Sequence, residues 1–286
     1  MAAHSVLKSL MERRSAAIVP GAPNALFARA IQDSGFEAVY VTGAGIANMS
    51  YGVPDVGLTT VSEVAETVAA IADSVSIPLI VDADTGFGNP LNMYRTVKTL
   101  ERAGAAALQI EDQVFPKRCG HFEGKSVVVA DEMVQKIKAA VDARRNEGLQ
   151  IIARTDARAV EGLDRAIERA HLYVEAGADA IFVEAPLSVE EIQRLGAEIG
   201  VPQILNIVFG GKTPEVPRER LSELGFSVVL YANAALQASL RAVYRVLASL
   251  GETGSLSAAG SQLASFQERQ QSVNKGFWDE LDARFR

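Results

Sequence analysis

Residues 151–184 read IIARTDARAVEGLDRAIERAHLYVEAGADAIFVE, and they contain one full repeat of the pattern that decides the fold. Residues 151–155 and 180–184 are nearly continuous apolar runs, which is typical of strands buried on both faces of a parallel sheet. Residues 163–176 between them have the apolar spacing of an amphipathic helix. Gly177 then supplies the left-handed residue that commonly closes a helix. The stretch therefore predicts a strand, a helix and a second strand.

The same alternation recurs along most of the chain. Helical patterns at residues 61–72, 93–103, 131–145 and 189–199 separate further apolar runs. Eight strand–helix units favour an α/β fold of the (β/α)8 TIM barrel type over an open doubly wound sheet, which usually has fewer strands and a glycine-rich first crossover. Residues 21–24, GAPN, are no such dinucleotide fingerprint. The predicted strands are residues 17–20, 38–42, 78–82, 107–111, 151–155, 180–184, 203–207 and 227–231.

The composition excludes several classes of protein. The 286 residues carry a formal net charge of −7 with no long basic run, so we expect no nucleic-acid partner. A single cysteine rules out a disulfide within the chain. No apolar stretch reaches the roughly 18 residues that a membrane span needs, and residues 1–20 lack the apolar core of a signal peptide. We therefore expect a soluble, cytoplasmic protein with no membrane contact.

The chain changes character near residue 250. Residues 1–250 are predicted to form the catalytic barrel domain, and residues 251–260 are rich in Gly, Ser and Ala. Residues 262–286 predict one or two amphipathic helices with an apolar stripe of Phe266, Phe277, Trp278, Leu281 and Phe285. This helical segment, residues 251–286, either docks on another subunit or packs on its own barrel, and its sequence favours neither.

Polar side chains follow nearly every predicted strand at its carboxyl end. Chemistry in a barrel enzyme takes place at this end, so these residues together indicate a site rather than solvated loop starts. Asp82 and Asp84 lie two residues apart on a strand, so both side chains point the same way, and Glu111 ends the adjacent strand. Three bare inward carboxylates repel one another. The polar strand ends are Thr42, Asp82, Asp84, Glu111, Arg154, Glu184 and Asn206.

A divalent cation resolves this repulsion. All-oxygen ligands without a paired His or Cys favour Mg²⁺ or Mn²⁺ over zinc. Such an ion has few direct protein ligands and keeps several waters, which the other carboxylates bind. Asp55, in the run Gly52-Val53-Pro54-Asp55, is a further candidate for binding those waters.

Three other polar residues are candidates for binding or proton transfer. Arg154 would anchor a substrate carboxylate, because its fork pairs with two oxygens at once; alternatively, it only offsets the acidic cluster. Glu184 and Asn206 would add hydrogen bonds or take part in proton transfer. His121 fits a substrate-binding donor better than a metal ligand, because no second His or Cys lies at chelating spacing.

Cys119, the only cysteine, lies in the polar run Lys117-Arg118-Cys119-Gly120-His121. Neighbouring positive charge favours the thiolate, which a thiol needs to exchange protons near neutral pH. The alternative is a small buried hydrophobe, since most free cysteines lie in the core. The polar neighbours and the adjacent glycine favour an exposed loop and a functional thiol.

Four segments carry a family resemblance: residues 81–88 (VDADTGFG), 110–113 (IEDQ), 117–121 (KRCGH) and 153–157 (ARTDA). Together they resemble the isocitrate lyase and phosphoenolpyruvate mutase superfamily, in the right order over residues 15–250. Within it the chain is most similar to the short 2-methylisocitrate lyase group and its 2,3-dimethylmalate lyase relatives. The resemblance implies a barrel whose last helix is swapped between subunits, in a homotetramer built as a dimer of such dimers.

The resemblance also implies the chemistry of the site. Retro-aldol cleavage of a small 2-hydroxy carboxylic acid would give a 2-keto acid such as pyruvate and the enolate of a second acid. Cys119, on a loop that closes over the site, would protonate that enolate, and Arg154 would assist at the nascent keto acid. Tyr40 or Glu184 would take the hydroxyl proton. The resemblance implies Mg²⁺ held by Asp82, with Asp84, Asp55 and Glu111 acting directly or through water. The implied substrate contacts are Thr42, Gly43, Ala44, Arg118, Gly120, His121, Arg154, Glu184 and Asn206.

Val208 and Phe209 depart from the methylisocitrate lyase pattern, in which a threonine and a glutamate resemble these two positions. An apolar pair cannot hydrogen-bond a third carboxylate, and burying that charge unpaired is costly. A hydrophobic lining instead suits an alkyl-substituted dicarboxylate. Residues 210–214, GGKTP, resemble the 2,3-dimethylmalate lyase and plant oxaloacetate hydrolase branch.

Three functions remain open at this point. The leading one is a Mg²⁺-dependent carbon–carbon lyase that acts on an alkylated 2-hydroxy di- or tricarboxylate. The second is an oxaloacetate hydrolase or decarboxylase, or a carboxyphosphonoenolpyruvate phosphonomutase, on the same barrel. The third is a barrel retained as a binding protein, against which the acidic cluster together with Cys119 argues.

Overall fold

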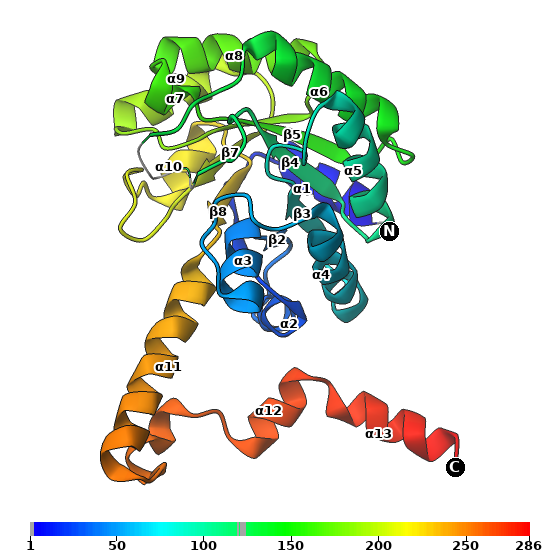
Figure 1. Ribbon diagram of the computed structural model, residues 1–286, viewed down its shortest axis with the longest axis vertical. Helices are drawn as coiled ribbons and strands as arrows, with labels where there is room; N and C mark the ends of the chain where they lie inside the picture. Colours follow the sequence, from blue (N-terminus) through cyan, green and yellow to red (C-terminus); the bar gives the residue numbers. More distant parts are fainter. Residues whose placement is uncertain (1–2, 119, 121–123) are drawn as a thin grey trace.

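The structure is a computed structural model that describes residues 3–118, 120 and 124–286. Within them eight parallel strands close into one barrel, in which each strand pairs with the next and β8 pairs with β1 (Figure 1). The predicted (β/α)8 barrel is confirmed. The strands are β1 (Ala17–Ala22), β2 (Val39–Val41), β3 (Leu79–Asp82), β4 (Ala107–Glu111), β5 (Gln150–Thr155), β6 (Ala180–Val183), β7 (Gln203–Asn206) and β8 (Val228–Tyr231).

Helices follow the strands and surround the barrel (Figure 1). Gly177, with φ 105°, adopts the left-handed conformation expected where the helix before β6 ends. The helices are α1 (Ala3–Glu12), α2 (Ala25–Asp33), α3 (Gly43–Tyr51), α4 (Val61–Ser74), α5 (Pro90–Arg102), α6 (Ala130–Ala143), α7 (Ala157–Val160), α8 (Leu163–Glu175), α9 (Val189–Glu198), α10 (Arg218–Glu223), α11 (Ala234–Thr253), the 3-10 helix η1 (Ser257–Gln262), α12 (Phe266–Ser272) and α13 (Lys275–Arg284).

Alternate strand residues form the inside of the barrel and lead directly to the site. Their lower members are apolar and pack against α1, whose Leu7, Leu10 and Met11 are buried with them. On β3, Ile80 and Asp82 lie two residues apart, so both side chains point to the inside of the barrel. The same step leads from Ile152 to Arg154, from Phe182 to Glu184 and from Ile204 to Asn206. The barrel interior therefore changes from apolar to polar at the carboxyl ends of its strands.

The outward strand faces pack against the helices and form the main core. Val41, Val81 and Ile151 belong to one buried cluster with helix residues such as Val68 and Leu100. Each large apolar side chain buried in this way stabilises the fold by about 1.5–3 kcal/mol. The strand ends that carry the polar residues are thereby held by a rigid, packed wall.

The chain leaves the barrel after β8. None of the residues of α11 is buried, and the helix projects away from the barrel before the chain turns into α12 and α13 (Figure 1). α12 lies against α2, where the Arg29 Nε donates to the Ser272 carbonyl oxygen at 2.9 Å. The predicted boundary at residue 250 falls inside α11, and the division into residues 1–250 and 251–286 stays a prediction.

Candidate active site

A cavity of about 40 Å³ lies at the carboxyl end of the barrel strands. Most of the predicted site residues line it: Tyr40, Thr42, Ala44, Asp55, Asp82, Glu111, Arg118, Gly120, Arg154, Glu184 and Asn206. Gly43 borders the cluster, because a Cβ there would lie 3.2 Å from the Asp82 Oδ2 and 3.4 Å from the Asp84 Oδ1. Cys119 and His121 lie outside the described residues.

The acidic cluster is built around the end of β3. The Asp84 backbone N–H donates to the Asp82 Oδ1 at 3.1 Å, and the Asp84 carbonyl accepts from the Glu111 N–H at 2.8 Å. Asp84 has a φ of 47°, a left-handed conformation that aspartate tolerates better than most residues but that still costs energy. The turn after β3 therefore brings the two aspartates and Glu111 together, as the sequence predicts.

The cluster has an excess of buried negative charge. Burial raises the pKa of Asp84 to about 6, and burial also raises the pKa of Glu111 well above its usual value. The Glu111 Oε1 has no hydrogen-bond partner among the described residues, although the side chain is only 2% exposed. These observations fit a bound cation, which would lower the cost of ionising both groups.

The donor set fits Mg²⁺ or Mn²⁺ rather than a metal held by many side chains. Among the described residues, no three His, Cys, Asp or Glu side chains are placed to bind one ion directly. Mg²⁺ commonly uses one or two carboxylates and completes its shell with water and substrate oxygens. Asp82, Asp84, Asp55 and Glu111 supply the carboxylate oxygens that such an ion and its waters would need.

Lys117 enters the acidic cluster, which the sequence does not predict. Its Nζ lies 2.8 Å from the Asp84 Oδ1 and pairs with the Asp55 Oδ1, and the residue is only 4% exposed. Burial alone would lower the pKa of this ammonium, but the carboxylates of Asp84 and Glu111 raise it well above its usual value. Lys117 is therefore a buried cation in the position where a metal is expected.

Arg154 joins the acidic cluster to the floor of the cavity. Its Nε and Nη2 donate to the Asp156 carboxylate at 3.0 and 3.2 Å. It also lies 3.3 Å from a Glu111 oxygen and 3.6 Å from a Glu184 oxygen, and it stacks over the Phe182 ring. Arg154 thus balances the negative charge of several carboxylates and also lines the cavity. Its position agrees with both predicted roles, binding a substrate carboxylate and neutralising the acidic cluster.

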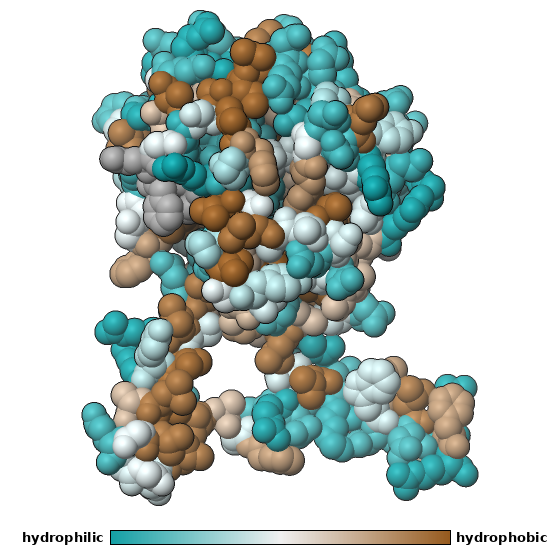
Figure 2. Space-filling view, viewed as in Figure 1, coloured by the Kyte–Doolittle hydropathy of each residue, from teal (hydrophilic) through white to brown (hydrophobic). Residues whose placement is uncertain are grey.

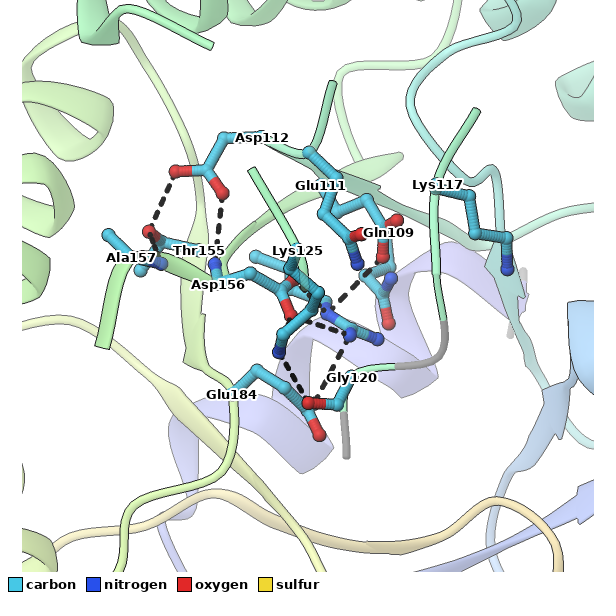
Figure 3. Close-up of polar contacts among 12 residues, drawn as sticks. Gln109, Glu111, Asp112, Lys117, Gly120, Lys125, Thr155, Asp156, Ala157 and Glu184 are labelled. Atoms are coloured by element: carbon cyan, nitrogen blue, oxygen red, sulfur yellow. Dashed lines mark hydrogen bonds and ion pairs between the residues drawn. The ribbon is translucent and has the colours of Figure 1, made fainter. Parts of the chain in front are cut away.

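The described part of the loop between β4 and α6 contacts the strand ends. The Gln113 side chain holds the Arg118 backbone by two hydrogen bonds of 2.9 and 2.8 Å. Lys125 donates to the Gly120 carbonyl oxygen and pairs with Asp156 at 2.6 Å (Figure 3). A Cβ on Gly120 would come within 2.6 Å of the Glu184 side chain, so only glycine permits this close approach.

Asp112 supports the site from behind the barrel wall. Its carboxylate accepts from the Thr155 hydroxyl at 2.7 Å and from the Asp156 N–H at 2.9 Å (Figure 3). The Tyr173 hydroxyl donates to the same carboxylate at 2.8 Å. Asp112 belongs to the motif IEDQ, but the sequence alone indicates no function for it. Its contacts fix the backbone of Asp156, and through it the position of Arg154.

Tyr40 is held as a hydrogen-bond donor. Its hydroxyl donates to the Gln109 Oε1 at 2.6 Å, and the Gln109 Nε2 in turn donates to the Asp82 Oδ1 at 3.3 Å. Burial raises the pKa of Tyr40 well above its usual value, so the phenol retains its proton. Of the two predicted bases, Tyr40 and Glu184, this environment favours Glu184. Gln109 itself was missed, although a polar residue inside the apolar run ALQIE was a usable signal.

The amino terminus of α3 faces the acidic cluster. The Thr42 side chain caps this helix by accepting from the Gly45 N–H at 3.2 Å. Ala44 in the first turn lines the cavity, and Gly43 lies against Asp82 and Asp84. Backbone N–H groups at the start of a helix bind carboxylates well. The three predicted contact residues Thr42, Gly43 and Ala44 therefore belong to one structural feature, the amino terminus of α3.

Val208 and Phe209 differ in their placement. Val208 lines the cavity, whereas Phe209 is 84% exposed and is absent from the lining. The expectation that both form an apolar wall for the substrate is therefore wrong for Phe209. The reason is that residues 208–209 follow β7 in a loop, where alternation no longer fixes the direction of a side chain.

Comparison with known proteins places the chain in a family. The family described as phosphoenolpyruvate phosphomutase matches residues 7–250. The 2-methylisocitrate lyase of Aeropyrum pernix is 48% identical over 87% of this chain and 80% of its own length. The crystal structure of a 2,3-dimethylmalate lyase matches with a TM-score of 0.93 at 33% identity, over 99% of this chain and 95% of that one. Phosphonopyruvate hydrolase in complex with oxalate and Mg²⁺ matches with a TM-score of 0.90 at 31% identity, over 100% and 99% of the two chains. The resemblance inferred from the motifs is thus confirmed, and the chain belongs to the PEP mutase/isocitrate lyase superfamily.

Proposed function

We propose that the chain is a Mg²⁺-dependent carbon–carbon lyase that cleaves a 2-hydroxy acid with a 2-alkyl group to pyruvate and a second carboxylic acid. The buried acidic cluster beside Arg154, beneath the described part of the β4–α6 loop, is the observation that carries the proposal. It provides both a cation site and a guanidinium where an oxyanion develops. The two lyases described above support this class of reaction.

The metal would be held by Asp82 and Asp84, with Asp55 and Glu111 acting through water. When bound, a divalent ion would supply positive charge beside the substrate oxygens on which negative charge develops. The Mg²⁺ in the complex of phosphonopyruvate hydrolase supports the choice of ion. Mn²⁺ has similar ligand preferences and is expected to substitute for it.

The chain's own residues then account for the proton transfers. Glu184, which lies in the cavity beside Arg154, would accept the proton of the C2 hydroxyl. The oxygen's electron pair forms the keto group, the C2–C3 bond breaks, and its electron pair stays on C3 as the enolate of the second acid. Cys119 would deliver the proton to C3, which completes the second product. Arg154 would pair with the keto acid that remains.

The substrate that we favour is an alkylated dicarboxylate of the 2,3-dimethylmalate type. The apolar part of the cavity lining consists of Val208, Phe182, Leu230 and Ala232, together with Ala44. Such a wall accepts a methyl group more readily than a third carboxylate, which would lose its hydration without a partner.

The test is a substrate panel with pyruvate formation as the readout. We expect 2,3-dimethylmalate and 2-methylisocitrate to release pyruvate in the presence of Mg²⁺, and the reaction to stop when EDTA removes the ion. Oxaloacetate and phosphonopyruvate serve as the competing substrates. Turnover of either of these, with none of the two alkylated acids, would contradict the lyase assignment. Asp82→Asn, tested for Mg²⁺ binding, is the matched control for the metal site.

Val208 is expected to set the preference between these two acids. In Val208→Thr, a hydroxyl in the cavity wall can donate to a third carboxylate. We expect the ratio of kcat/KM for 2-methylisocitrate over 2,3-dimethylmalate to rise by about 2- to 10-fold, the effect of one hydrogen bond. Phe209→Glu is the control, because the neighbouring side chain is exposed and should leave the ratio unchanged. An unchanged ratio in Val208→Thr would move the origin of specificity to another part of the cavity.

We also propose that the projecting segment serves the assembly of the predicted homotetramer. Leu240, Val243, Tyr244 and Leu247 on α11 are all more than half exposed, and Figure 2 shows hydrophobic residues gathered on this segment. An exposed apolar helix is costly unless a partner covers it. Exchange of α11 between two subunits would cover it.

The location of the protein stays a prediction. No described helix is both long and apolar enough to span a bilayer. The cytoplasmic location and the absence of a nucleic-acid partner are expectations from composition alone.

A further inference from the structure

The Lys117 ammonium lies inside the group of carboxylates that would receive the metal. It contacts Asp55, which comes from the segment between α3 and α4, and Asp84, which follows β3. Two carboxylates from different elements therefore converge on one buried cation. We propose that Lys117 is an internal competitor of the divalent ion, which shares the acidic cluster with it and lowers its affinity. This inference rests on the proposed function, because it presupposes a metal at this cluster.

The position of Lys117 is imposed by the loop and not by chance rotation of a surface side chain. The next residue, Arg118, is fixed through its backbone N–H and carbonyl by the Gln113 side chain. Gln113 is itself buried and bridges to Val127 on the returning part of the loop. The Lys117 stem thus starts from an anchored backbone, and the side chain is 4% exposed. Because the ammonium is tethered in this way, its effective concentration at the carboxylates is high.

The cluster retains polar atoms that Lys117 does not satisfy. The Glu111 Oε1 and the Asn206 Oδ1 have no hydrogen-bond partner among the described residues, and both side chains are more than nine-tenths buried. The adjoining cavity of about 40 Å³ has room for a few water-sized groups. These atoms point to a further polar occupant, hydrated or ionic, next to the ammonium.

Two cations in one buried cluster oppose each other. Asp55 and Asp84 can pair with Lys117 or help to bind a divalent ion. A carboxylate oxygen that contacts the ammonium is not available to the metal ion. Repulsion between the ammonium and a divalent ion in the same cluster would be far stronger inside the barrel mouth than in water. The native lysine therefore weakens metal binding and keeps the cluster stable when the metal is absent.

Lys125 offers a matched control on the same loop. Its side chain is 1% exposed, and its Nζ pairs with Asp156 at 2.6 Å. Asp156 already accepts two hydrogen bonds from Arg154 and is separate from the carboxylates that Lys117 contacts. Removing the Lys125 charge also removes a buried cation from the loop, but one that does not contact the acidic cluster.

The experiment measures metal binding to the full chain without substrate. Mn²⁺ binding is followed by the EPR signal of the free ion, and Mg²⁺ binding by calorimetry. We expect Lys117→Met, which keeps the length of the side chain and removes its charge, to bind both ions at least about tenfold more tightly. Lys117→Arg, which keeps the charge, and Lys125→Met should stay within about threefold of the wild type.

A second measurement guards against a folding defect. With EDTA present, Lys117→Met should melt at a lower temperature than the wild type, because its carboxylates have lost their counter-ion. Saturating Mg²⁺ should then raise the melting temperature of Lys117→Met more than that of the wild type.

The outcomes separate this inference from the proposed function. Unchanged or weaker binding in Lys117→Met, with normal binding by the wild type, overturns the competition and leaves the metal site intact. Equal tightening in Lys117→Met and Lys125→Met also overturns it, because the effect would then be one of general charge. Absence of binding in the wild type and in every variant overturns the metal-dependent function as well.

Discussion

Cys119→Ala is expected to lower kcat by about 10²–10⁴-fold, the contribution of a positioned general acid. The enolate that cleavage leaves on C3 needs a proton, and a thiol directly preceded by Lys117 and Arg118 is suited to deliver it. Cys119 itself lies outside the described residues, but Arg118 and Gly120 on either side of it both line the cavity. Gly120 packs directly against the Glu184 side chain, so the chain borders the cavity at this point. KM should change little, because the thiol is needed after binding.

The stereochemistry of the product provides the sharper readout. With 2,3-dimethylmalate in deuterated water, the wild type should place one deuterium on a single face of the propionate carbon. Cys119→Ala should lose this preference, since solvent then supplies the proton from either side. Cys119→Ser, which keeps the size of the side chain but is a far weaker acid, should lose activity as well. Mg²⁺ binding is the control and should be normal in both variants. Wild-type turnover in Cys119→Ala would refute the proton-donor role.

The barrel was predictable because its strands are buried on both faces. Such strands are short, nearly continuous apolar runs, and the helices between them have a different period, so Ala107–Glu111 was located to the residue. The inward direction of Asp82 and Asp84 followed from the two-residue period of a strand. α3 was missed, because two of its first three residues, Gly43 and Gly45, are poor helix formers. Its start depends on the Thr42 cap and on packing against the barrel mouth.

The contacts made by loop residues were not predictable from the sequence. Lys117 and Lys125 lie on either side of Cys119, yet no local pattern indicates that one meets Asp84 and the other Asp156. Each ion pair joins segments that only the closed barrel brings together. Phe209 illustrates the same limit, since periodicity ends with β7 and the side chain turns to solvent. Strand periodicity therefore predicts the floor of the site, whereas its roof depends on tertiary contacts.

Arg154→Gln is expected to affect both stability and catalysis. Asp156, Glu111 and Glu184 would lose a buried cation, and leaving buried charges unpaired costs about 3–5 kcal/mol. If Arg154 also binds the substrate carboxylate or the keto product, kcat/KM should fall by about 10²–10³-fold, as for loss of a donor that stabilises an oxyanion. Chemical denaturation and pyruvate formation measure the two effects separately. Arg158→Gln is the control for losing an arginine–carboxylate pair outside the cavity, because Arg158 pairs with Glu191.

Arg154→Lys decides between the two roles that the sequence left open for this residue. A lysine restores one positive charge among the carboxylates, so much of the lost stability should return in this variant. It cannot restore the planar fork that donates to Asp156 through two nitrogens while the same group faces the cavity. We therefore expect a folded, Mg²⁺-binding protein whose kcat/KM remains close to that of Arg154→Gln. Recovery of both stability and activity in Arg154→Lys would mean that Arg154 only balances the acidic cluster, and that the substrate carboxylate binds instead at the amino terminus of α3.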